Sequence, residues 1–142
     1  MPPTDVSLIL KAVLDSIGPS GLSDDTLEQL QILLPETLIL AALDLVDRQK
    51  VIEYTTPWGS ALYEVMGSTA VYSVHLDMPS YPMPYYCTCP AFAYAVLMSE
   101  THTICKHVLA SYVARQASLC LTRSVNSDDL VQLISRQCDS ER

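Results

Sequence analysis

The spacing of apolar residues divides the chain into a helical first part and a strand-forming middle part. Up to Lys50, apolar residues recur three or four positions apart, which is the spacing of an amphipathic helix. After Lys50 the spacing changes to two, and β-branched and aromatic residues become frequent, as in β-strands. Helical spacing returns after Pro90. The pattern therefore predicts an α+β fold with helices at both ends of the chain and a sheet between them.

Three helices are predicted in the first part. The first covers residues 5–17 and ends at Gly18, which is followed by proline. The second begins after Ser23, a favourable N-cap residue with two acids behind it, and ends at Pro35. The third covers residues 36–50 and has a wide apolar face. A wide face is typical of a helix buried against the domain's own sheet, and binding of a partner subunit is the alternative.

Three runs with a period of two predict a three-stranded antiparallel meander: 51–55, 62–65 and 70–74. Tyr54, Tyr63 and Tyr72 recur nine residues apart in these runs, and we expect them on one face of the sheet. Packing in the core is the favoured interpretation of these tyrosines. The alternative is a platform on which nucleic-acid bases stack, but no basic residues interleave with the tyrosines as such a platform requires.

The most informative motif is a C-x-C pair followed by fifteen residues and a C-x-H pair. Cys87 and Cys89 are two positions apart, so in an extended segment both side chains point the same way. Cys105 and His107 have the same spacing, which suits the point where a chain enters a helix, because free N–H groups there stabilise thiolates. Three sulfurs and one imidazole form a tetrahedral set for one Zn²⁺ ion. Four protein ligands leave no open position, so the predicted zinc is structural.

The segments around this motif complete the predicted organisation. Residues 90–98 read as a short buried helix between the two ligand pairs, and residues 99–103 as a polar return loop. Residues 78–84 are rich in proline and are expected to be a linker. After His107 a helix is predicted to continue to about Leu119.

A last helix is predicted after Asn126, with Asp129 three residues on as in a capping box. The chain is accordingly divided into an N-terminal helical region (1–50), a β-meander with zinc-binding helices (51–120) and a C-terminal helix (121–142). The fold expected is thus α+β, with N-terminal helices, a three-stranded antiparallel sheet and a zinc knuckle joined to C-terminal helices.

Charge and composition argue against several kinds of function for this chain. The net charge is −8 and the eight Lys and Arg residues are spread along the chain, so tight nucleic-acid binding by this chain alone is not expected. The apolar stretch 30–46 is interrupted by Pro35 and Asp44, which argues against a membrane span. The N-terminus has no positively charged leader, and a reducing compartment is expected for the thiols. The remaining cysteines, Cys120 and Cys138, are interpreted as residues that pack helices.

Two catalytic interpretations of the cysteines are less favoured. Cys105 and His107 could form a nucleophile–base pair, but a separation of two positions is a ligand spacing, and no orienting group is apparent. A RING-type ubiquitin ligase needs two zinc sites and eight ligands. Five cysteines and three histidines add up to eight, yet the four outside the two pairs lack paired spacing: His75, His102, Cys120 and Cys138. No catalytic residue is therefore predicted.

Three segments carry a resemblance to a known family: Ala42–Gln49, Cys89–Ala93 and Cys105–Ala110. Together with the C-x-C and C-x-H pairs, they resemble the SWIM-type zinc fingers, and among these the SWIM subunits of Shu complexes. The resemblance extends from about the second helix to the helix after His107.

The resemblance implies a non-enzymatic, zinc-binding adaptor in the nucleus. Such a subunit pairs with a RecA-like paralogue subunit, and the pair promotes assembly of RecA-family recombinase filaments during DNA repair by homologous recombination. DNA would be contacted through the partner, which agrees with the acidic charge of this chain. The alternative function is direct binding of single-stranded DNA by the zinc finger.

Overall fold

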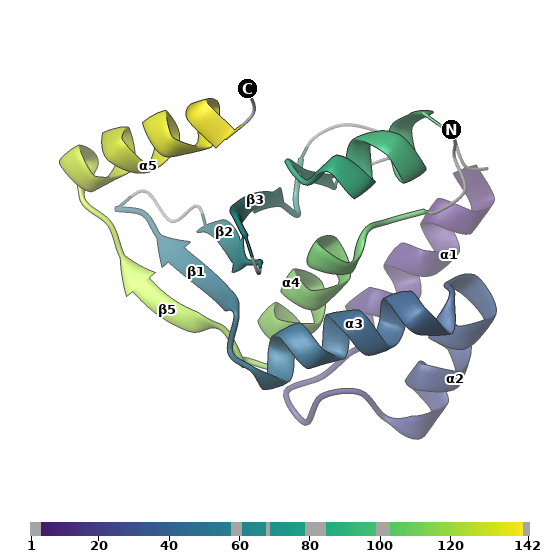
Figure 1. The fold of residues 1–142 in the computed structure, drawn as a ribbon. Helices are drawn as coiled ribbons and strands as arrows, with labels where there is room; N and C mark the ends of the chain where they lie inside the picture. Colours follow the sequence, from purple (N-terminus) through teal and green to yellow (C-terminus); the bar gives the residue numbers. More distant parts are fainter. Residues whose placement is uncertain (1–3, 58–60, 68, 79–84, 99–102, 141–142) are drawn as a thin grey trace.

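The computed structural model of the protein contains a mixed sheet of five strands with helices on both faces (Figure 1). The structure describes residues 4–57, 61–67, 69–78, 85–98 and 103–140. The predicted linker (78–84) and return loop (99–103), with His102, fall largely outside these ranges. The α+β class is confirmed, and the predicted boundaries between the three regions stay predictions.

The three N-terminal helices form where the local signals place them. They are α1 (Thr4–Asp15), α2 (Asp24–Leu33) and α3 (Glu36–Asp47). Ser23 is the N-cap of α2, and its hydroxyl oxygen accepts a hydrogen bond from the backbone N–H of Thr26 at 3.2 Å. Pro35 is the N-cap of α3. Gln49, just beyond α3, has a φ of 57°, and this left-handed conformation separates the helix from the first strand.

The sheet has more strands than the three predicted. The meander of β1 (Val51–Thr55), β2 (Ala61–Met66) and β3 (Val71–His75) is antiparallel, as expected. β4 (Tyr86–Cys87) adds to β3, and β5 (Leu121–Ser124) adds to β1 as a parallel strand, giving the order β4-β3-β2-β1-β5. β4 and β5 are too short for a period of two to be recognised, so the prediction of a three-stranded sheet was wrong in this respect.

The three tyrosines do not share one face of the sheet. Tyr63 lies opposite Val74, and Tyr72 opposite Val65, so these two tyrosines face the N-terminal helices and α4. Tyr54 lies opposite Leu62, not opposite Tyr63, and therefore points to the other face. The prediction for Tyr54 was wrong because the nine-residue spacing includes turn residues, and a shift of one residue moves a side chain to the opposite face.

The second half of the chain contributes η1 (Phe92–Met98), a π-helix, and the α-helices α4 (Lys106–Gln116) and α5 (Ser127–Ser140). The short helix between the ligand pairs is thus confirmed, but only one side of it is buried: Phe92 and Val96 are buried, whereas Tyr94 is 68% exposed. The predicted capping box is confirmed as well: the Asp129 N–H donates to Asn126 Oδ1 at 2.8 Å, and the Asn126 N–H donates to Asp129 Oδ2 at 3.4 Å.

α4 ends before Leu119 because Ser118 takes up a left-handed conformation with a φ of 58°. Cys120 consequently lies between α4 and β5 and not in a helix, and it packs, partly buried, against the main core that contains α4. The side chain of Cys138 lies outside the described part of the structure.

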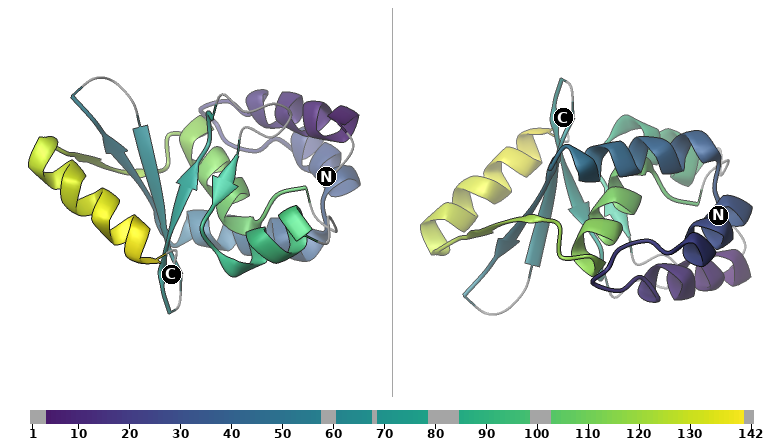
Figure 2. Two further views of the ribbon diagram at one scale, coloured as in Figure 1. Left: turned by 90° about the horizontal axis from the view of Figure 1, so that it is seen from above. Right: turned by 90° about the horizontal axis from the view of Figure 1, so that it is seen from below.

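Helix α4 lies at the centre of the main core. It contacts the sheet on one side and α1 and α3 on the other, while α5 covers the opposite face of the sheet (Figure 2). Eight consecutive residues of α4, His107 to Ala114, are buried. A smaller cluster on the face toward α5 includes Ile52, Tyr54 and Val125. None of the helices in the described ranges combines the length and apolar character needed to cross a bilayer.

Candidate metal centre

The structure brings the four residues of the two short pairs together. One potential ligand atom from each of Cys87, Cys89, Cys105 and His107 lies within 4.8 Å of each of the others, and all four residues are buried. In the described part of the chain, this is the only such group of cysteine, histidine or acidic side chains. A second zinc site of the RING type is therefore not found among the described residues.

The first ligand pair is held against strand β3. Cys87 ends β4, and Thr88 forms two hydrogen bonds with Ser73: its N–H donates to the Ser73 carbonyl at 3.1 Å, and its side-chain oxygen accepts from the Ser73 N–H at 3.0 Å. These bonds keep the segment extended along the sheet edge. Because alternate residues of an extended segment share a side, Cys87 and Cys89 can bind one ion.

The second ligand pair lies at the beginning of helix α4, as predicted. Cys105 is the N-cap residue, with extended backbone angles of φ −93° and ψ 170°, and His107 is the second residue of the helix. The change from extended to helical backbone at this point brings a residue before the helix and a residue in its first turn to the same ion. The Cys89 Sγ accepts a hydrogen bond from the Phe92 N–H at 3.3 Å, which joins η1 to the centre.

Strand β3 also supports the histidine. The ring of Tyr72 lies 4.6 Å from the imidazole of His107, measured between ring centroids, with an angle of 38° between the planes. His107 Nδ1 is buried and has no hydrogen-bond partner among the described groups. A buried polar atom without a partner is costly in a protein that lacks the metal.

The electrostatics of the sulfurs favour a bound cation. Hydrogen bonds from the thiols of Cys105 and Cys87 hold the pKa of Cys89 well below its usual range. Hydrogen bonds to the neighbouring sulfurs raise the pKa of Cys87, and burial raises the pKa of Cys105 to about 12. Zinc binds the thiolate form of each sulfur, and its two positive charges would offset the repulsion that three thiolates this close together would otherwise exert on one another.

The residues present therefore fit one structural zinc ion. We infer that Cys87, Cys89, Cys105 and His107 are its ligands, since three sulfurs and one imidazole are the donors that zinc prefers and together they complete a tetrahedral set. The bound ion would link β4, the segment before η1 and the beginning of α4, which are separate in the sequence.

Zinc binding is expected to weaken steeply as the pH falls. Cys87 and Cys105 have raised pKa values, so both are protonated near neutral pH in the metal-free protein and must release their protons to bind zinc. Because two protons must leave for each zinc ion that binds, the apparent association constant should fall roughly 100-fold for each unit by which the pH decreases. Competition with a chromophoric chelator between about pH 7 and 8.5 would measure this slope. An affinity that does not change with pH would contradict it.

Other residues noted in the sequence lie outside this centre. His75 is in β3, and its ring lies 6.2 Å from that of Tyr86 between centroids, tilted by 38°. Burial raises the pKa of the Cys120 thiol to about 12, and this cysteine is not part of the cluster. Sequence reasoning missed the supporting roles of Tyr72 and Ser73. From the sequence, Tyr72 and Ser73 could be recognised only as residues of a strand. Their contacts with the centre join segments that are distant in the chain.

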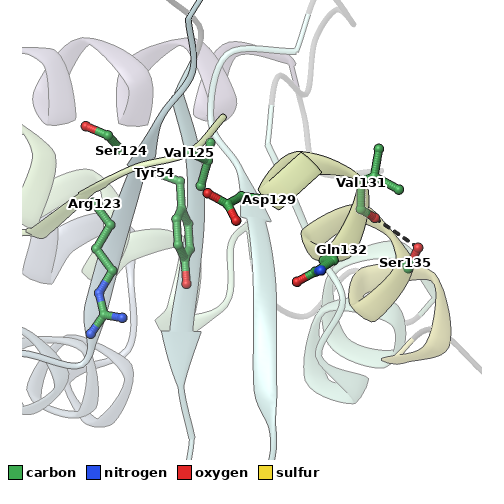
Figure 3. Close-up of a pocket in the computed structure, with 8 residues that line it drawn as sticks. All are labelled: Tyr54, Arg123, Ser124, Val125, Asp129, Val131, Gln132 and Ser135. Atoms are coloured by element: carbon green, nitrogen blue, oxygen red, sulfur yellow. Dashed lines mark hydrogen bonds between the residues drawn. The ribbon is translucent and has the colours of Figure 1, made fainter. Parts of the chain in front are cut away.

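A cavity of about 730 Å³ lies elsewhere in the molecule, between α5 and the edge of the sheet formed by β1 and β5. Figure 3 shows Arg123 and Asp129 at its wall, together with Tyr54 and residues of α5. Its lining includes charged groups of both signs and no cysteine or histidine. The cavity is therefore separate from the metal centre in both position and chemistry.

Comparison with known proteins agrees with the zinc chemistry. The SWIM zinc finger family matches residues 72–116, which include all four candidate ligands. The chain is similar to zinc finger SWIM domain-containing protein 7 of Homo sapiens, with 37% identity over 98 residues, covering 66% of this chain and 63% of the human protein. No solved structure gives a significant match.

Relatives from other animals bear the same name. The Mus musculus protein is 33% identical over 134 residues, covering 91% of this chain and 79% of its own length. The Danio rerio protein is 32% identical over 99 residues, covering 69% and 66%, respectively. The matched region thus leaves between about a fifth and two fifths of each relative uncovered. Taken with the SWIM match around the Cys and His cluster, these similarities show that the chain belongs to the family of zinc finger SWIM domain-containing protein 7.

Proposed function

We propose that this protein is a non-enzymatic adaptor subunit of a Shu-like complex. In this role it pairs with a RecA-like paralogue subunit, and the pair promotes assembly of RecA-family recombinase filaments in homologous recombination. The proposal is supported by membership of the SWIM domain-containing protein 7 family and by the resemblance of three sequence segments to SWIM subunits of Shu complexes. Residence in the nucleus is part of the same proposal.

The closed ligand set is the observation that carries the adaptor role. Catalytic zinc needs a coordination position open to water or substrate. Here two cysteines from the sheet edge and a cysteine and histidine from the start of α4 complete four ligands, and all four are buried. Zinc in this site would stabilise the fold, and a stabilised fold without a reactive centre suits a subunit that acts by binding another protein.

The distribution of basic side chains favours contact with DNA through the partner. Three basic residues are paired with acids of the same chain: Lys11 with Asp15, Arg48 with Asp44 and Arg115 with Asp77. Pairing leaves these side chains less available for phosphates, in a chain that already carries a net charge of −8. Direct binding of single-stranded DNA is the second candidate, and the exposed Lys106 beside the metal centre is the observation that favours it.

Co-expression with the RecA-like paralogue from the same genome tests the adaptor role. We expect the wild-type chain and the paralogue to purify together with one zinc ion per SWIM subunit. Cys105→Ser should lose both zinc and the paralogue, because the ligand set and the surrounding fold depend on each other. Cys120→Ser is the matched control and should keep both.

Two outcomes would contradict the proposal in different ways. A zinc-free Cys105→Ser protein that holds the paralogue as tightly as wild type would show that zinc and partner binding are not coupled. A wild-type, zinc-loaded chain that does not bind the paralogue would remove the adaptor role. A salt-sensitive gel shift by the purified single chain would instead support direct DNA binding.

A further inference from the structure

An apolar groove lies between helices α1 and α2. It has a volume of about 430 Å³, and Ile9, Ala12 and Val13 of α1 face Ile32 and Leu33 of α2 across it. The two helices belong to the layer on the side of the sheet away from α5 (Figure 2). The groove is thus separate from both the metal centre and the charged cavity beneath α5.

The groove exposes large apolar side chains. Ile32 is 81% exposed, the highest value for a large hydrophobic residue in the described part of the chain, and Ile9 is 52% exposed. Leu8, next to Ile9, is also exposed. Isolated apolar residues on a surface are ordinary, but isoleucines exposed on two adjacent helices along one groove are characteristic of a contact surface.

The charges around the groove are acidic. The stretch that carries α1 and α2, residues 4–33, contains five Asp and Glu residues and a single basic residue, Lys11, which is paired with Asp15 at 2.9 Å. On α2, Asp25 and Glu28 are exposed, and each is four positions before a residue that lines the groove. Positions four apart share one side of a helix, so these carboxylates lie along the rim of the groove.

We infer that the groove binds an amphipathic helix of the partner subunit, whose apolar stripe is flanked by Lys or Arg side chains. An apolar groove between two helices suits the apolar face of a third, and the acidic rim selects basic flanks. A second copy of this chain would oppose acidic rims to each other, and nucleic acid or an anionic lipid surface would be repelled. The inference rests on the proposed adaptor function and adds to it the surface used and the chemistry of the partner helix.

Substitution of the exposed isoleucines tests the groove. The full chain is titrated against the RecA-like paralogue, and Ile32→Glu and Ile9→Glu are each expected to raise the Kd roughly 30-fold, as for loss of an anchor residue in an interface. Val131→Glu is the matched control: Val131 is on α5, across the sheet, and is 65% exposed. It should bind like wild type, and zinc content and circular dichroism should be unchanged in all three variants.

The charge of the rim is tested separately. Wild-type binding should weaken as the salt concentration rises, and the double variant Asp25→Lys/Glu28→Lys should bind more weakly and lose this salt dependence. Normal affinity of Ile32→Glu and Ile9→Glu for the paralogue would show that the partner helix does not bind in the groove, and it would leave the adaptor role intact. Self-association of the wild-type chain that Ile32→Glu abolishes would also overturn this inference, by assigning the groove to a second copy. Absence of any wild-type complex would refute the adaptor role and the groove together.

Discussion

Replacing Cys89 by serine is expected to release the zinc and unfold the part of the protein built around it. Structural zinc binding contributes about 10–16 kcal/mol in small zinc fingers, whereas whole domains are stable by roughly 5–15 kcal/mol. Cys89 also accepts the hydrogen bond of the Phe92 N–H, so the substitution weakens the beginning of η1 as well. The lost free energy of zinc binding should therefore exceed the stability that the remaining interactions of the β4–η1–α4 region provide.

Zinc content measured by mass spectrometry and helix content followed by circular dichroism would check this result. Cys120→Ser is the control, because Cys120 is a partly buried thiol outside the cluster and should change stability little. Treatment of the wild-type protein with a strong chelator should reproduce the behaviour of Cys89→Ser. A Cys89→Ser protein with one bound zinc and an unchanged melting temperature would refute the assignment of this ligand.

Tyr112→Ala is expected to lower the free energy of unfolding by about 3–5 kcal/mol, the range for truncating a large buried aromatic side chain. Tyr112 is fully buried in α4 and packs edge-on against Tyr85, with ring centroids 5.9 Å apart. Burial raises the pKa of Tyr112, so its hydroxyl stays protonated and donates to Asp15 of α1. Partial burial raises the pKa of Asp15, but the hydrogen bonds from Tyr112 and Lys11 outweigh it and leave that pKa lowered.

The substitution would thus leave a cavity between α4 and α1 and remove the two hydrogen bonds that the Tyr112 hydroxyl forms with Asp15 and Lys11 of α1. Chemical denaturation followed by circular dichroism measures the loss. Tyr94→Ala is the matched control, since Tyr94 is 68% exposed and the same truncation there should cost well under about 1 kcal/mol. Equal losses for the two variants would contradict the central position of α4 in the core.

The elements that sequence reasoning predicted well depend on neighbouring residues. Ser23 and the Asn126–Asp129 pair cap helices through hydrogen bonds that span three positions, so their effect is visible in a short window. The metal centre was predictable for the same reason. The residue types of the C-x-C and C-x-H pairs define a zinc ligand set, and their spacing defines the backbone that each pair needs.

The elements that sequence reasoning missed depend on residues that are far apart in the chain. β5 is a strand because it pairs with β1, and the register joins Ile52 to Leu121, which are about half the length of the chain apart. Nothing in the four-residue segment itself distinguishes it from a loop. The orientation of Tyr54 likewise follows from the pairing with Leu62, which the periodicity of either strand alone does not reveal.

The amino-acid sequence by itself determined the helix boundaries near their caps, the class of fold and the donor set of the metal centre. Only the tertiary structure decided the order of the five strands, the face on which each tyrosine lies, and the support that Ser73 and Tyr72 give to the ligands. Caps and ligand pairs act over two to four positions, where the backbone geometry is local. Strand pairing and side-chain packing join segments that are far apart in sequence, and their outcome depends on how the whole chain buries its apolar surface.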